Sequence, residues 1–155
     1  MAQAHWLSPG EQRAWRAHLQ MQSRLAAELN RRLQATCGLS LADYDVLVHL
    51  SEAEQGRLRP FELQQRLQWE QSRLAHQLSR MQRRGLVDRE RSTDDGRGSL
   101  VTLSGAGRDV LRRAAPAHVE DVRALVFDGL SAADVTGMER LATGVLSRLH
   151  DGATD

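Results

Sequence analysis

The 155-residue chain contains a single cysteine, Cys37, and no lysine. One cysteine cannot form an internal disulfide, which excludes the disulfide-stapled class of small secreted proteins. No run of about 18 apolar residues occurs, so we expect no membrane-spanning helix and no membrane partner. The first residues, MAQAHWLSPGEQ, lack a basic start followed by an apolar stretch, which predicts a cytoplasmic protein without a secretion signal.

The 21 basic side chains are all arginines, and they are unevenly distributed along the chain. Residues 57–97 hold ten arginines and six acidic residues, a local charge of +4 in a chain of net charge +1. Residues 71–87 hold four arginines and no acidic residue. A basic centre between acidic ends is typical of a DNA-binding surface, although an arginine-rich face is often simply solvated.

Helix signals dominate the sequence. Ser8 begins a Ser-Pro-Gly-Glu capping box, which predicts a long helix that ends near Gly38. Similar boxes at Ser40 and Ser131 predict a second helix, broken at Gly56, and the last helix. The last helix carries an apolar stripe at helical spacing: Val135, Met138, Leu141, Ala142, Val145, Leu146 and Leu149.

The middle of the chain predicts two helices and a hairpin. Pro60 begins a short helix, and residues 71–84 form a basic helix with Leu74, Leu78 and Met81 facing inward. Two short extended runs then flank the turn sequence TDDGRG, in which Asp95–Gly96 is a strong hairpin signal. This order is typical of a winged helix-turn-helix, in which a helix enters the major groove of DNA beside a hairpin.

A third long helix is predicted from Ser104 to about Phe127, with a kink at Pro116. The fold class that follows is mainly α-helical with a small β-hairpin wing. The sequence contains no nucleophile elbow, phosphate loop or metal-ligand pair, so we predict neither an enzyme nor a cofactor. The six histidines form no His-x₃-His pair, and we predict no metal site.

Residues 78–111, LSRMQRRGLVDRERSTDDGRGSLVTLSGAGRDVL, resemble the multiple-antibiotic-resistance-regulator (MarR) family. The family pattern is a recognition helix ending in a basic pair and Gly-Leu-Val, an arginine strand, a wing with Asp-x-Arg, and a Gly-containing helix start. The matching residues here are Arg83, Arg84, Gly85, Leu86, Val87, Arg89, Asp95, Gly96, Arg97, Leu103, Ser104 and Gly107. The sequence departs from the pattern at Gln64, Gln68 and Glu70, where small residues and a serine cap are usual.

The resemblance implies a homodimeric transcriptional regulator, by expectation a repressor, that binds a pseudo-palindromic operator in double-stranded DNA. A small-molecule effector would release it. Within a single domain over 1–155, residues 40–103 would form the winged DNA-binding lobe. The dimerisation helices would be 8–37 and 104–150.

The predicted recognition helix leaves six side chains facing outward or sideways for DNA: Gln71, Ser72, Arg73, His76, Gln77 and Arg80. Arginine suits guanine and glutamine suits adenine, so we expect Arg73 and Gln71 at base edges. His76 and Arg80 would contact bases or phosphates.

The predicted wing supplies a second set of contacts. The resemblance implies that Arg97 enters the minor groove, where narrow A·T tracts attract arginine. Asp95 would support Arg97 or the wing backbone, and Arg89 and Arg91 would contact phosphates or pair internally.

The resemblance also implies an effector cleft for a phenolic or other organic acid. Trp15, His18, Tyr44 and His49 come from the helices that would line it, although Trp15 equally suits a core or dimer seam. Peroxide-sensing relatives carry a reactive cysteine nearer the chain start, so we do not expect Cys37 to sense oxidation. An oxidation- or metal-responsive regulator, or a winged-helix module that binds protein, is the alternative reading.

Overall fold

The computed structural model describes residues 5–91 and 98–151. The first helix, α1 (Pro9–Cys37), begins at the predicted capping box, in which Glu11 N–H donates to Ser8 Oγ at 3.3 Å and Ser8 N–H donates to Glu11 Oε2 at 2.7 Å. It ends at Gly38, whose φ of +67° is the left-handed conformation that favours glycine. The predicted first helix is therefore confirmed at both ends.

The second helix, α2 (Leu41–Ser51), also begins at its predicted box but ends earlier than expected. The sequence predicts a break at Gly56, whereas a separate 3₁₀ turn occupies Glu54–Gly56. In that turn Gln55 and Gly56 both have positive φ, which reverses the chain direction before the short strand β1 (Arg57–Leu58). A two-residue strand carries no alternating pattern, and β1 was not predicted.

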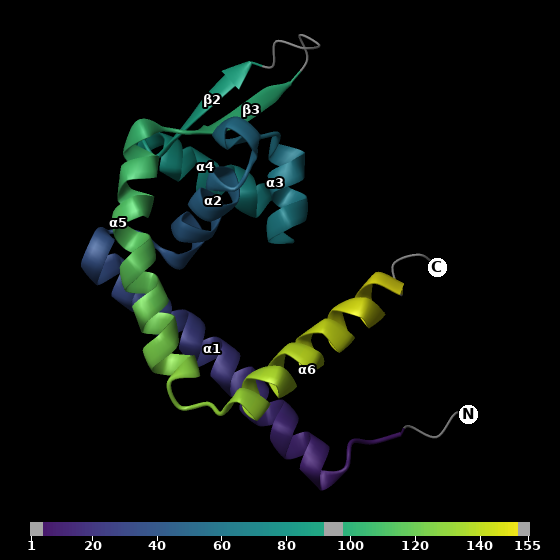
Figure 1. Cartoon of the computed structure of the whole chain (residues 1–155). Helices are drawn as coiled ribbons and strands as arrows, with labels where there is room; N and C mark the ends of the chain where they lie inside the picture. The colour runs from purple at the N-terminus through teal and green to yellow at the C-terminus, as the bar shows by residue number, and fades with distance from the viewer. Residues whose placement is uncertain (1–4, 92–97, 152–155) are drawn as a thin grey trace. The chain divides into compact units, whose positions relative to one another are not determined.

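The helix-turn-helix consists of α3 (Pro60–Leu67) and α4 (Gln71–Arg83), which agrees with the predicted helices to within one residue at the end of α4. The turn between them places Gln68 at φ +53°, a left-handed position that a smaller residue would occupy more easily. Figure 1 shows α3 and α4 packed with α2 into one lobe, from which the hairpin projects.

The sheet has three antiparallel strands in the order β1-β3-β2. The hairpin strands β2 (Val87–Arg91) and β3 (Ser99–Leu103) pair from Val87↔Leu103 to Arg91↔Ser99, and β1 pairs with the other edge of β3. The predicted hairpin is confirmed in its strands, whereas the turn residues 92–97 lie outside the described residues.

Two further helices complete the chain. The helix α5 (Gly105–Val122) continues through Pro116, and its departure from α-helical geometry comes later, as a π-helical turn at Arg123–Phe127. The predicted helix is thus correct in extent, but the irregularity lies beyond the proline. The last helix, α6 (Ala132–Asp151), begins at its predicted box, in which Asp134 N–H donates to Ser131 Oγ.

The hydrophobic core lies within the winged-helix lobe. Nine side chains there are essentially inaccessible to solvent: Leu39, Val46, Leu47, Leu50, Leu63, Leu78, Met81, Val87 and Val101. Gly107 packs so closely that a Cβ atom at that position would lie 2.1 Å from the Leu86 carbonyl oxygen, which explains why this helix start needs glycine. Among the described residues, those up to His118 form one compact unit, and those from Val119 onward form a second.

Candidate nucleic-acid interface

The recognition helix α4 has one face buried in the lobe and one face open to solvent. Leu74, Leu78 and Met81 face the core, as predicted. Residues three or four apart share a helix face, so the stripe opposite the core can be read from the spacing. Four exposed side chains form this outward stripe: Ser72, His76, Ser79 and Arg83.

One flank of α4 points toward α2 and carries Arg73, Gln77 and Arg80, with Arg84 following at the helix end. Arg73 is stacked on an aromatic ring, with its guanidinium carbon 4.2 Å from the centre of the Trp69 ring. This cation–π contact holds Arg73 beside the helix start, at the edge of the outward stripe.

Gln77 corrects a sequence prediction. We expected its side chain to face outward or sideways, but it is only 4 % exposed. Its Nε2 donates to Asp43 Oδ1 at 2.6 Å, and its Oε1 accepts from Arg80. Gln77 is therefore a buried structural residue, and its burial could not be predicted from the sequence because its partner lies on another helix.

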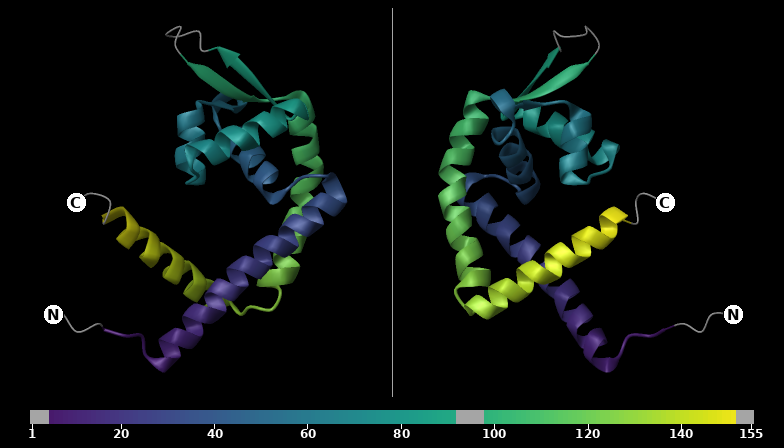
Figure 2. Two further views of the ribbon diagram at one scale, coloured as in Figure 1. Left: turned by 180° about the vertical axis from the view of Figure 1, so that it is seen from behind. Right: turned by 45° about the vertical axis from the view of Figure 1, so that its right-hand side comes forward.

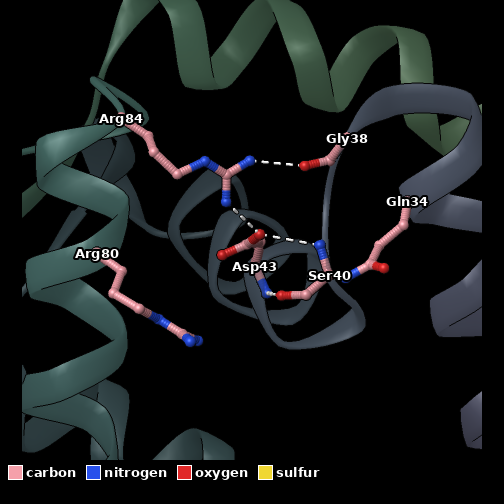
Figure 3. A pocket seen from close by; sticks show the side chains of 6 residues that line it. All are labelled: Gln34, Gly38, Ser40, Asp43, Arg80 and Arg84. Atoms are coloured by element: carbon pink, nitrogen blue, oxygen red, sulfur yellow. Dashed lines mark hydrogen bonds and ion pairs between the residues drawn. The ribbon is translucent and has the colours of Figure 1, made fainter.

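Asp43 collects donors from two other parts of the lobe (Figure 3). Arg84 Nη1 donates to Asp43 Oδ2 at 2.7 Å, and Arg84 Nη2 donates to the carbonyl oxygen of Gly38 at 2.7 Å. The backbone N–H of Ser40 also donates to Asp43 Oδ2. A cavity of about 190 Å³ opens beside these groups, and Arg80 and Gln34 complete its lining.

The other flank of α4 faces α3 and an open groove of about 560 Å³. Gln71 lies at this groove together with Phe61, which is 67 % exposed, and Gln64. Arg89, from strand β2, also lines it. The groove thus joins the start of α4 to the base of the hairpin.

The predicted wing residues are only partly described. Arg89 is exposed on β2, and the backbone of Arg91 ends that strand. Asp95 and Arg97 lie outside the described residues, so their predicted roles remain predictions.

The four residues predicted for an effector cleft occur as two separate pairs. Trp15 and His18 stack on each other on α1, with ring centres 5.7 Å apart. Tyr44 is buried on α2 and packs 4.4 Å from the ring of His118, while His49 is half-buried on the same helix. None of the four lines either of the two cavities described above.

The Tyr44–His118 contact lies beside an unusual carboxyl group. Burial raises the pKa of Asp45 above its ordinary value, although the nearby His49, His118 and Arg73 act in the opposite direction. The Nδ1 atom of His118 is buried and has no hydrogen-bond partner among the described residues. Within the described ranges, no three His, Cys, Asp or Glu side chains are grouped to hold a metal ion.

Sequence reasoning missed Ser79 and Arg83 as candidate contact residues. Both lie on the outward stripe, and a helical projection from the predicted core residues would have found them. It also missed Asp43, which looked like an ordinary capping residue.

None of the described helices combines the length and the apolar character of a membrane span.

Comparison with known proteins agrees with this arrangement. A sequence profile of the MarR family matches residues 38–98, which cover the winged-helix lobe up to the hairpin. The chain is 26 % identical over 137 residues to the transcriptional repressor MprA of Escherichia coli K12, covering 88 % of this chain and 77 % of that protein.

Two solved structures from Streptomyces coelicolor match nearly the whole chain. AbsC, a MarR family transcriptional regulator, is 36 % identical with a TM-score of 0.89, covering 96 % of this chain and 99 % of AbsC. Sco3205, a MarR family regulator solved in complex with DNA, is 35 % identical with a TM-score of 0.90, covering 96 % of this chain and 93 % of Sco3205. The predicted fold class is confirmed, and the family is one of regulators rather than enzymes. The chain therefore belongs to the MarR family of transcriptional regulators.

Proposed function

We propose that this regulator binds a pseudo-palindromic operator as a homodimer, with α4 in the major groove and the β2–β3 hairpin beside it. The observation that carries the proposal is the outward stripe of α4, which is exposed, free of acidic residues and ends in Arg83. An exposed helix with this chemistry fits the major groove. The similar protein Sco3205 was solved in complex with DNA, which supports the same activity here.

The outward stripe changes the set of side chains that we expect at DNA. His76 stays a candidate because it lies on the stripe, Gln77 is withdrawn because it is buried, and Arg83 is added because it points away from the core. Arg73 contacts DNA from its stacked position on Trp69, at the edge of the stripe. Arg89 lies at the hairpin base, and the predicted entry of Arg97 into the minor groove belongs to the same proposal.

Homodimer formation is supported by exposed apolar side chains on α6 and around the start of α1. On α6, Leu141, Leu146 and Leu149 are 61 %, 54 % and 64 % exposed. On and before α1, Trp6 and Trp15 are 83 % and 54 % exposed. Monomeric proteins rarely leave such surfaces open, so we assign them to the dimer interface.

Repression and effector release complete the proposal. The similar protein MprA is a transcriptional repressor, which supports the same role here. In a dimer the two α4 helices would meet half-sites about 34–36 Å apart, one turn of DNA. A small aromatic or organic acid that changed this spacing would weaken operator binding, and DNA would weaken binding of that acid to the same degree.

The first test is selection of bound DNA from a random pool, with an enriched palindromic site as the expected result. Arg83→Gln should then weaken binding to that site by about 1–3 kcal/mol and relax the preference for the base that Arg83 contacts. Arg113→Gln on α5 is the matched control, because it removes the same exposed charge outside the proposed interface. A pool without enrichment and binding insensitive to salt would instead favour a protein-binding module.

A further inference from the structure

We infer that Asp43 is a positioning residue for DNA binding, because it ties the recognition helix α4 to the joint between α1 and α2. The inference rests on the proposed function and adds a residue that does not itself reach DNA. Asp43 is 2 % exposed and lies on α2, where it contacts a flank of α4 and not its outward stripe.

The carboxylate of Asp43 accepts from three donors, two of them on or at the end of α4 and one before α2. Oδ1 accepts from Gln77 in the middle of α4, and Oδ2 accepts from Arg84 at its end. Oδ2 also accepts the backbone N–H of Ser40, before α2. A buried carboxylate is costly unless its lone pairs are filled, so this arrangement is stable only when α4 and the start of α2 keep their places.

The hydrogen bond that Asp43 accepts from Gln77 also fixes the orientation of the Gln77 side-chain amide. Because Nε2 donates to Asp43, Oε1 is left to accept from Arg80. A side-chain amide without a fixed partner can turn over and present its donor instead. Asp43 therefore controls the position of Arg80, an exposed cation beside the outward stripe, through Gln77.

Arg84 extends the connection to the first helix. Its guanidinium bridges Asp43 and the carbonyl oxygen of Gly38, the C-terminal cap of α1 (Figure 3). The proposed dimer contains α1, and a dimer binds two half-sites only when its recognition helices are correctly spaced. The contacts through Asp43 would thus transmit the placement of α1 to α4.

The test compares affinity for the enriched site with affinity for random DNA of equal length. Asp43→Asn keeps the shape of the side chain but replaces one acceptor by a donor. We expect it to weaken binding to the enriched site by about tenfold or more, as one mismatched base pair does. Binding to random DNA should stay near the wild-type value, because exposed arginines supply it.

Ser40→Ala is the matched control. If Asp43 only stabilised the fold, it would do so through the N-terminal cap of α2, and this variant weakens that cap. It removes the hydroxyl that accepts the Asp43 N–H and leaves the carboxylate bonds to Gln77 and Arg84 in place. We expect it to lower the melting temperature without changing the ratio of the two affinities. A ratio lowered equally in both variants would overturn the inference.

Gln77→Leu provides a second variant in case Asp43→Asn does not fold. It fills the buried position with a side chain of similar volume and removes both bonds of the Gln77 amide, to Asp43 and from Arg80, while Arg84 and Ser40 still donate to Asp43, so the ratio should fall here too. An unchanged ratio in whichever variant is folded overturns the positioning role while the proposed function stands. A wild-type protein with no preference for any site overturns both.

Discussion

The winged-helix lobe and the last helix, α6, both carry apolar residues at helical spacing. These residues are buried in the lobe and exposed on α6. In the lobe, Leu47 on α2 and Leu63 on α3 are fully buried. On α6, none of residues 132–150 is buried, and Leu149 is 64 % exposed. The first 16 or so residues of α1 resemble α6 in this respect, and Figure 2 shows that part of α1 extending away from the lobe.

The difference shows that an apolar stripe on a helix predicts a packing partner. The stripe does not indicate whether that partner lies in the same chain or in another copy. The lobe closes its core with its own strands and helices. The helix α6 carries an exposed apolar stripe at the same helical spacing, which is the reason for assigning it to a dimer. The following predictions test this division, beginning with the largest expected effect.

Truncation of a core residue should affect folding of the lobe directly. Leu47→Ala should lower the free energy of unfolding by about 2–5 kcal/mol, because it leaves a cavity in a fully buried position. Chemical denaturation followed by circular dichroism measures this loss. A loss as small as that of an exposed leucine would break the distinction between the two regions.

A charge placed on the α6 stripe should separate the dimer. Leu141→Asp removes about 2 kcal/mol of apolar burial per protomer and leaves a carboxylate at the interface. We expect a shift from dimer to monomer in light scattering, with loss of operator binding. Ser147→Asp introduces the same charge on the opposite side of α6 and should stay dimeric. Equal behaviour of the two variants would argue against the stripe as the interface.

The next prediction concerns the stability contribution of Asp45, which lies between the buried and exposed parts of α2. Because burial raises the pKa of this carboxyl, the folded state holds its proton at a pH where the unfolded chain has lost it. Its charged form therefore costs stability at neutral pH, and this cost disappears below about pH 4. Asp45→Asn should raise the melting temperature at pH 7 by ~2 °C and lose that advantage in acid.

The control for Asp45 is Glu52→Gln, which neutralises an exposed carboxyl at the end of the same helix. It should show no such dependence on pH. If Asp45→Asn instead lowered the melting temperature at pH 7, attraction from His49, His118 and Arg73 would outweigh burial.

The smallest effect is expected at a partly exposed group of ion pairs on α1. Hydrogen bonds from Arg31 and Arg32 lower the pKa of Glu28 to about 2. Such pairs add little stability because water and salt screen them. Glu28→Gln should leave the melting temperature unchanged within error. A clear drop would show that this stretch of α1 is covered in the dimer, which would sharpen the comparison between α1 and α6.

Much of the local structure was predictable from neighbouring residues. The three boxes at Ser8, Ser40 and Ser131 each set a helix start, because their bonds span only three residues. The hairpin strands followed from a turn signal of similar range. In contrast, β1 could not be predicted, since Arg57 and Leu58 become a strand only by pairing with Thr102 and Val101.

The candidate site likewise has features that the sequence predicts and features that depend on the tertiary structure. The basic character of residues 71–87 and the inward positions of α4 were readable from the sequence. The burial of Gln77 was not, because its partner Asp43 is 34 residues away in the chain. The role of Arg84, predicted only as half of a basic pair, also depended on contacts 41 and 46 residues distant.

The sequence by itself determined the helix starts, the hairpin, the apolar stripes and the family resemblance, because each depends on short spacings that one segment contains. Only the tertiary structure decided which of the two adjacent arginines at the end of α4 is bound within the lobe. Arg83 points outward, whereas Arg84 is engaged by Asp43 and Gly38. The two are adjacent and chemically identical, and a rotation of about 100° per residue places one toward solvent and the other toward α2.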